Sequence, residues 1–286
     1  MSPWITYFKE RSPIVPLLVM SVGIGLSGEA LAHHKPEALP TVASIFALML
    51  FFFLARLMDE KKDFAKDQIA HPQRPLPRGL LTVAQVERAI GGVAIFALAM
   101  SVVFGALFGL AAGALYAVTT AYLWLMYREF YVGHALAEHP VYYAITHQIV
   151  IIPLYGFTVS VVSHDFAAPF SRLAVGYYVA NLGFNMAYEV SRKLDPSADP
   201  VLKTYLKVLG RPRTLVLIYA SLVVGAVGSV LLGLPKLGIG FAVYVALVVA
   251  FGFVKTEKFK WVEGAAVLGG FFAIWSAFAA FELGWL

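Results

Sequence analysis

The chain has 286 residues, of which 60% are hydrophobic and 14% charged, and its mean hydropathy is +0.76. This composition excludes an ordinary soluble domain and predicts an integral membrane protein. Cysteine is absent, which excludes disulfides, thiolate metal sites and cysteine nucleophiles. The net charge of +5 does not indicate a nucleic-acid partner, because the basic residues gather in the connections between apolar runs.

Apolar runs of about 20 residues, the length that crosses a bilayer as a helix, recur along the whole sequence. They fall at 13–33, 40–58, 90–109, 110–127, 141–163, 170–191, 213–233, 236–254 and 262–284. Two of the divisions depend on short breaks, at Gly109 with its neighbouring glycines and at Gly233, Leu234 and Pro235. The sequence therefore predicts an all-α fold, a polytopic helical bundle with about nine transmembrane helices in one domain, 1–286.

The basic residues are divided unevenly between the two sides of this bundle. With the amino terminus in the cytoplasm, all of the 22 Lys and Arg residues except Lys35, Arg172 and Lys236 fall in or beside cytoplasmic connections. This asymmetry follows the positive-inside rule and favours both that orientation and an odd number of spans. The segment that ends at His33 is interpreted as the first span, because it is long for a signal peptide. We expect a multi-pass protein of the cell membrane.

The connection after the second predicted span carries a cluster of carboxylates. Asp59, Asp63 and Asp67 are four residues apart, so in a helix they would share one face. Like charges at this spacing repel unless a cation lies among them, and Mg2+ suits carboxylate oxygens together with substrate phosphates. Arg74 and Arg78 follow in a proline-rich loop that would aim guanidinium groups at the same phosphates. The alternative is a solvated loop of mixed charge.

A second cluster lies near the end of the sixth predicted span, on the same side of the membrane. Asn181, Asn185 and Glu189 recur at four-residue spacing. Because polar groups inside a bilayer are costly, Asn185 and Glu189 are predicted to bind metal or substrate, whereas interhelical hydrogen bonding explains Asn181. Lys193 or Arg192 would alternatively form a simple salt bridge with Glu189. Asp195 is either a further ligand or a surface charge.

These two clusters, the first followed by His-Pro-Gln-Arg-Pro-Leu-Pro-Arg-Gly at 71–79, resemble the UbiA superfamily of intramembrane prenyltransferases over nearly the whole chain. The resemblance implies an all-helical domain around a central cavity, with an active site on the cytoplasmic side. It implies Mg2+ as the cofactor and transfer of an isoprenyl group from an isoprenyl diphosphate to a lipophilic acceptor, such as an aromatic compound, within the lipid bilayer. No nucleic acid is expected among the partners.

The resemblance also implies roles for individual residues. Asp59 and Asp63 match the spaced aspartates of the family's first metal-binding motif, and Glu189 matches the leading aspartate of the second. The predicted metal ligands are Asp59, Asp63, Asp67, Asn185, Glu189 and Asp195. The residues predicted to bind the diphosphate are Arg74, Arg78, Arg128 and Lys193.

The chain departs from the family's pattern in both motifs. Ala55 and Arg56 stand where the family usually has Asn and Asp, and Lys193 stands where it usually has a further aspartate. Either Asp67 and Asp195 compensate, or a lysine or arginine binds the diphosphate directly as a fixed charge. We interpret the chain as a divergent member of the family.

Two other functions stay open at the level of the sequence. A terpene cyclase on the same scaffold would trap the allylic cation with the donor's own double bonds, and residue spacing does not separate this reaction from transfer. A membrane transporter for a cation would need polar groups at the midplane or on interrupted helices, whereas the acidic clusters lie on one side only.

Overall fold

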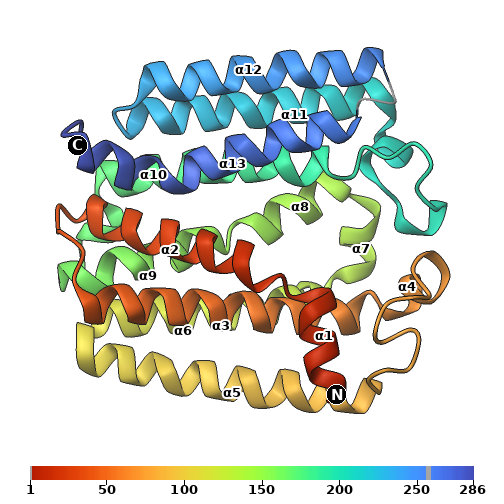
Figure 1. Ribbon diagram of the computed structural model, residues 1–286, viewed down its shortest axis with the longest axis horizontal. Helices are drawn as coiled ribbons and strands as arrows, with labels where there is room; N and C mark the ends of the chain where they lie inside the picture. Colours follow the sequence, from red (N-terminus) through yellow and green to blue (C-terminus); the bar gives the residue numbers. More distant parts are fainter. Residues whose placement is uncertain (1, 256–258) are drawn as a thin grey trace.

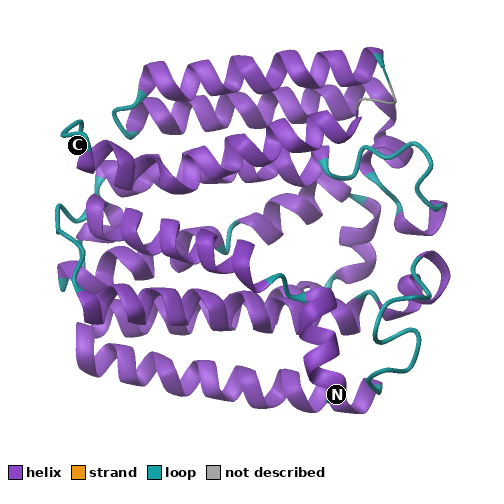
Figure 2. Cartoon of the chain, viewed as in Figure 1, coloured by secondary structure: helices purple, strands orange, loops and turns teal. Residues whose placement is uncertain are grey.

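The computed structural model describes residues 2–255 and 259–286, and all regular elements in these two ranges are helices (Figure 2). Most of the long helices run along the long axis of the molecule (Figure 1). In chain order the elements are α1 (Pro3–Arg11), α2 (Ile14–Leu31), α3 (Ala38–Lys62), α4 (Phe64–Ala70), α5 (Val83–Phe108), α6 (Leu110–Tyr127), η1 (Glu129–Tyr131), α7 (Gly133–Glu138), α8 (Pro140–Gln148), α9 (Ile151–Ser163), η2 (Ala168–Phe170), α10 (Arg172–Ser191), η3 (Pro200–Leu202), α11 (Tyr205–Leu231), α12 (Pro235–Val254) and α13 (Phe259–Glu282).

Eight helical segments in the described part of the chain are long and apolar enough to cross a membrane. They are α2, α3, α5, α6, the consecutive pair α8 and α9, α11, α12 and α13. The remaining predicted span, 170–191, forms α10, a helix of 20 residues that is too polar to meet the same standard. The expected all-helical polytopic bundle is confirmed, with eight candidate spans where about nine were predicted.

The helix breaks predicted at glycine are present. Gly109 separates α5 from α6 with a φ of +94°, and Gly233 lies between α11 and α12 with a φ of +90°. Glycine adopts a positive φ without steric cost because it has no Cβ. These two turns let α6 return along α5 and α12 return along α11 (Figure 1).

Glycines also bring α10 close to α11. A Cβ on Gly183 would collide with the backbone of Gly225, and a Cβ on Gly228 would collide with the backbone of Ala180. Small residues at such interfaces let two membrane helices approach closely, so that dispersion forces hold them together. Beside this contact Asn181 is fully buried, and its Nδ2 donates to a carbonyl of α13 at 3.3 Å, which is the interhelical role expected for it.

The short helices gather at one end of the bundle, on the right in Figure 1. Here α1, α4 and α7 lie near the carboxyl ends of α3 and α10. Helix α1 is attached to α3, since Arg11 Nε donates to Glu60 Oε2 at 2.8 Å and the ring of Phe8 stacks on that of Phe53 at 5.0 Å. These short helices thus partly cover the end of the molecule that carries both acidic clusters.

Candidate active site

The first acidic cluster lies where α3 ends. Asp59 is in the last turn of α3 and Asp63 is the residue that follows the helix, with the backbone N–H of Asp63 donating to the carbonyl of Asp59 at 2.9 Å. Burial, followed by the nearby charge of Asp59, raises the pKa of the Asp63 carboxyl above its ordinary value. Lys62 Nζ lies 3.5 Å from Asp59 Oδ1 and supplies a compensating positive charge.

Asp67 is directed to a different partner. Its side chain is 2% exposed, and Arg74 Nη1 donates to both of its carboxylate oxygens, at 2.6 and 2.7 Å. Withdrawing Arg74 toward a phosphate would leave Asp67 buried and unpaired, which costs about 3–5 kcal/mol. Asp67, an expected metal ligand, and Arg74, an expected phosphate ligand, therefore form an ion pair with each other in the structure.

The other two predicted arginines also have local partners. Arg78 Nη2 forms an exposed ion pair with Glu10 of α1 at 2.8 Å. Arg128 follows α6, and its guanidinium lies 5.4 Å from the centroid of the Tyr131 ring. The structure does not bring Arg78 or Arg128 into contact with the carboxylates of α3.

The second acidic cluster forms a compact charged group at the carboxyl end of α10. Glu189 Oε2 accepts from Arg192 Nε at 2.6 Å, and Glu189 Oε1 pairs with the ammonium of Lys193. Lys193 also lies over the ring of Tyr205, 5.5 Å from its centroid. Both salt bridges that the sequence allowed are present, and the group carries one more positive charge than negative.

Two predicted metal ligands near Glu189 have other neighbours. The Asn185 side chain lies beside the hydroxyl of Tyr155 inside the bundle. Asp195 is exposed, and its Oδ1 accepts from the backbone N–H and the hydroxyl of Ser197, at 2.8 and 2.6 Å. These hydrogen bonds hold the pKa of Asp195 below its ordinary value. Asn185 thus lies deeper than Glu189 in the bundle, and Asp195 stabilises a turn at the surface.

Helix α8 connects the two clusters. Lys62 of α3 lies over Tyr143 of α8, with its Nζ 5.7 Å from the centroid of the ring. One turn further along α8, His147 interacts electrostatically with Lys62, Asp59 and Glu189. The charged ends of α3 and α10 therefore both lie within electrostatic range of α8.

Sequence reasoning did not include Lys62, Tyr143 or His147 in the site. A signal was available, because Tyr143 and His147 are four residues apart and so share a helical face in an otherwise apolar segment. What the spacing does not reveal is that this face turns toward α3.

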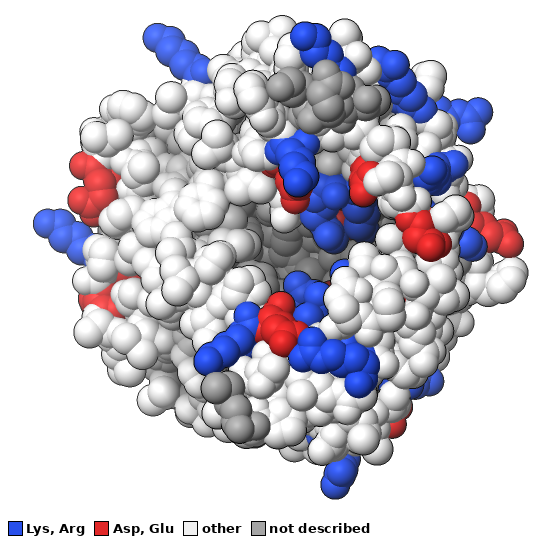
Figure 3. Space-filling model, turned by 45° about the vertical axis from the view of Figure 1, so that its right-hand side comes forward, with Lys and Arg blue, Asp and Glu red and all other residues white. Residues whose placement is uncertain are grey.

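At this end of the molecule, a hollow in the surface coincides with a concentration of charged side chains. Figure 3 shows a hollow with Lys and Arg side chains gathered around it and a few carboxylates among them. Lys62, Arg192 and Lys193 lie near the carboxylates just described and are 16%, 42% and 36% exposed. Such a surface attracts a multiply charged anion.

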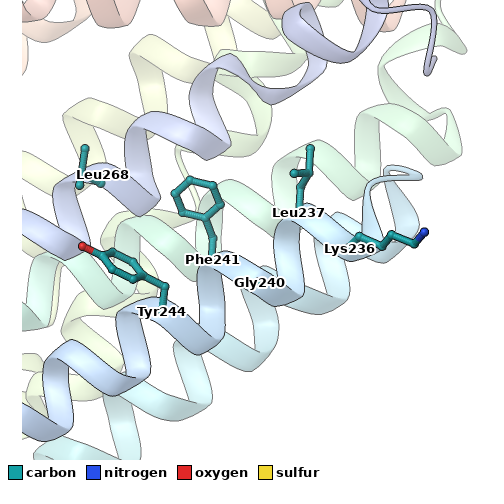
Figure 4. Close-up of a pocket in the computed structure, with 6 residues that line it drawn as sticks. All are labelled: Lys236, Leu237, Gly240, Phe241, Tyr244 and Leu268. Atoms are coloured by element: carbon teal, nitrogen blue, oxygen red, sulfur yellow. The ribbon is translucent and has the colours of Figure 1, made fainter.

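A separate pocket of about 470 Å3 lies between α12 and α13 (Figure 4). It is lined by Lys236, Leu237, Gly240, Phe241, Tyr244 and Leu268. Its wall is apolar and contains no carboxylate, so it does not resemble a site for a charged substrate and matches the lipid-facing surface of a membrane helix.

Within residues 2–255 and 259–286 no group of three or more His, Asp or Glu side chains is arranged to hold a metal ion. The carboxylates of α3 and α10 are instead interleaved with lysine and arginine. This arrangement can bind an anion directly, and it leaves only a few carboxylates to bind a metal ion.

These observations define the class of the protein, which is an all-helical membrane protein with an anion-attracting site between two acidic motifs. The sequence matches the model of the UbiA prenyltransferase family over residues 19–277, and the chain belongs to that family. It is therefore a membrane transferase of isoprenoid groups, and its family is generally Mg2+-dependent.

The fold is similar to a solved structure described for digeranylgeranylglyceryl phosphate synthase in membranes. The two chains are 13% identical, the TM-score is 0.67, and the likeness covers 97% of this chain and 99% of the other. At this identity the likeness supports the fold alone. A comparison with curated proteins found no match.

Proposed function

We propose that this single transmembrane domain transfers an isoprenyl group from an isoprenyl diphosphate to a lipophilic acceptor within the membrane, using Mg2+. Family membership establishes prenyl transfer in general. The observation that carries the finer proposal is that Asp59 of α3 interacts electrostatically with Arg192 at the end of α10, so carboxylates of one motif lie within range of cations of the other. The excess of Lys and Arg at this end favours the cytoplasmic side of the cell membrane.

Asp59 and Asp63 are the residues that fit Mg2+. They lie at the carboxyl end of α3, where the helix dipole disfavours anions, and their charges repel each other. Mg2+ commonly uses one or two carboxylates, waters and substrate phosphates, so two carboxylates suffice. When bound, Mg2+ would neutralise negative charge on the departing diphosphate.

The α10 side of the site fits the diphosphate itself. Arg192 and Lys193 together outweigh the charge of Glu189, and Lys62 approaches from α3. Glu189 would orient these two side chains toward the hollow, in place of binding a second metal. Lys193, which departs from the family's pattern, then becomes a fixed positive charge on the phosphates.

These residues supply what ionisation of the donor requires. When the carbon–oxygen bond to diphosphate breaks, negative charge grows on the leaving group, and positive groups already in place stabilise it. The allylic cation left behind needs a dry cavity with aromatic faces. Tyr143 and Tyr205 lie beside the cations of the site and are suited to this role.

A terpene cyclase would use the same ionisation, so it is the second candidate. The two reactions differ in whether a product forms without an acceptor. Membership of a transferase family gives no support to cation transport.

The proposal is tested with purified protein in detergent, Mg2+ and radiolabelled isoprenyl diphosphates of several chain lengths, with and without a membrane lipid extract. We expect release of diphosphate that requires Mg2+ and is lost in Asp63→Asn and Glu189→Gln. Asp165→Asn is the matched control, because its carboxylate accepts from the backbone N–H of Ala167 in the turn that follows α9, and it should retain release. Failure of the wild-type chain to bind or ionise every donor would refute the proposal, and product without acceptor would favour cyclisation.

A further inference from the structure

His147 presents an unused hydrogen-bond acceptor at the junction of the two acidic clusters. Its Nδ1 lies 2.7 Å from the backbone carbonyl oxygen of Tyr143. A carbonyl oxygen only accepts, so Nδ1 carries the proton and Nε2 presents its lone pair. Nε2 is buried, and no residue in the described part of the chain hydrogen-bonds to it. A buried acceptor without a partner is uncommon and calls for an explanation.

The ring of His147 is held in place from two sides. It stacks on the ring of Tyr143, with centroids 4.0 Å apart and planes inclined by 16°. Phe130 meets it edge-on at 5.8 Å, and Phe130 is itself packed against Tyr122, whose hydroxyl donates to the carbonyl of Thr146 at 2.8 Å. The direction of Nε2 is therefore set by the surrounding structure.

The turn that carries Phe130 is strained. Glu129, Phe130 and Tyr131 all have positive φ values, of +48°, +54° and +59°. Residues with a Cβ rarely adopt this conformation, and three in succession persist only where the surroundings impose it. The strained turn directs Phe130 against His147 and thereby completes the wall around the imidazole.

The charged groups that face His147 suit a proton acceptor. The positive charge of Lys62 of α3 disfavours protonation of the imidazole before the reaction. The negative charges of Asp59 of α3 and Glu189 of α10 would stabilise an imidazolium once it forms. His147 thus stacks on Tyr143 and lies within electrostatic range of Lys62, one of the groups proposed to hold the diphosphate. A side chain in this place can receive a proton released beside the departing diphosphate.

We propose that Nε2 of His147 is the general base for the acceptor, and that the acceptor presents a hydroxyl group there. This inference rests on the function proposed above. The hydroxyl first donates a hydrogen bond to Nε2. As the carbon–oxygen bond to diphosphate breaks, its electron pair leaves with the diphosphate. The acceptor's electron pair forms the new bond to the isoprenyl carbon, and the acceptor's proton moves to Nε2.

The same geometry selects among acceptors. A neutral hydroxyl can donate to Nε2, whereas an acceptor carboxylate placed there would find no hydrogen-bond donor. We therefore expect alcohols or phenols to be alkylated and carboxylates to be poor acceptors at this position.

The test separates donor binding from acceptor alkylation. The full chain in detergent is given Mg2+ and isoprenyl diphosphates, with a long-chain alkylphenol and a 1-alkylglycerol as hydroxyl probes. His147→Asn retains a donor for the Tyr143 carbonyl but no base. We expect unchanged donor affinity and a rate of alkylation lowered about 100- to 10,000-fold. His139→Asn, an exposed histidine in the same connection, is the control and should be unaffected.

A second variant distinguishes chemistry from structure. His147→Ala should regain alkylation when imidazole is added, because the free base can occupy the vacated space. Full activity of His147→Asn would overturn the inference, and so would a loss of activity that imidazole does not restore in His147→Ala. An inactive wild-type chain that ionises no donor would instead refute the underlying proposal of function.

Discussion

Lys62 Nζ lies 3.5 Å from the carboxylate of Asp59 and 5.7 Å from the centroid of the Tyr143 ring, so one ammonium group joins the first acidic cluster to α8. This side chain neutralises part of the charge of α3 and at the same time offers a positive group to the hollow. Four predictions follow from this arrangement and from the packing around it, besides those tested above.

Replacing Lys62 by methionine should weaken binding of the donor. The substitution keeps the aliphatic stem but removes a charge-assisted hydrogen bond worth about 1.5–3 kcal/mol, which corresponds to a rise in Kd of roughly 10- to 100-fold. The measurement is the Kd of a fluorescent isoprenyl diphosphate analogue. Lys61→Met is the control, since Lys61 pairs with Glu87 at the surface, 3.2 Å away. Equal affinity in the two variants would contradict the role given to Lys62.

Removing Arg74 should destabilise the protein more than it affects the site. Arg74→Met leaves Asp67 buried without a partner, and we expect a loss of about 3–5 kcal/mol in the free energy of unfolding. The double variant Asp67→Asn with Arg74→Met should recover much of this loss, because no buried charge then remains. Thermal unfolding in detergent provides the comparison. Greater loss in the double variant than in Arg74→Met would show that the ion pair is not the cause.

The pH dependence of stability should reveal Asp63. Because its pKa is raised in the folded protein, the folded state holds the proton more tightly than the unfolded state does. In EDTA, the contribution of Asp63 to stability should therefore be greatest at acid pH and fall as the pH rises from 3.8, the ordinary value, through the raised pKa, which appears as a change in the Tm difference between the wild-type chain and Asp63→Asn. Asp63→Asn should remove this fall. The measurement is Tm against pH with and without Mg2+, which should stabilise the wild-type chain only.

The contact between α10 and α11 should tolerate no side chain at its glycines. Gly228→Ala places a methyl group against the backbone of Ala180, and overpacking of this kind costs about 1–3 kcal/mol. Gly240→Ala on α12 is the control, since a Cβ there meets nothing within 4 Å and alanine favours the helix by about 1 kcal/mol. A Tm lowered in Gly228→Ala and retained in Gly240→Ala is the expected result.

The amino-acid sequence by itself determined the class of the protein. Hydropathy along the chain is a local property, so the spans, the breaks at Gly109 and Gly233, and the charged end were predictable from it. The four-residue spacing was enough to place Asn185 and Glu189 on one face of α10, whereas α3 ends at Lys62, before Asp63. The family match agrees with the function that the two clusters implied.

Only the tertiary structure decided which charged side chains pair with each other. Sequence reasoning directed Arg74 toward phosphate, whereas the fold of the loop delivers it to Asp67. It left open whether Glu189 binds a metal or forms a salt bridge. In the structure, the two cations that pair with Glu189 both come from the end of α10. His147 came to the site because α8 packs against α10 and Lys62 of α3 reaches over Tyr143, one turn from His147 on α8. Several partners of opposite charge lie within reach of each residue along the chain, and only the packing of distant helices selects one.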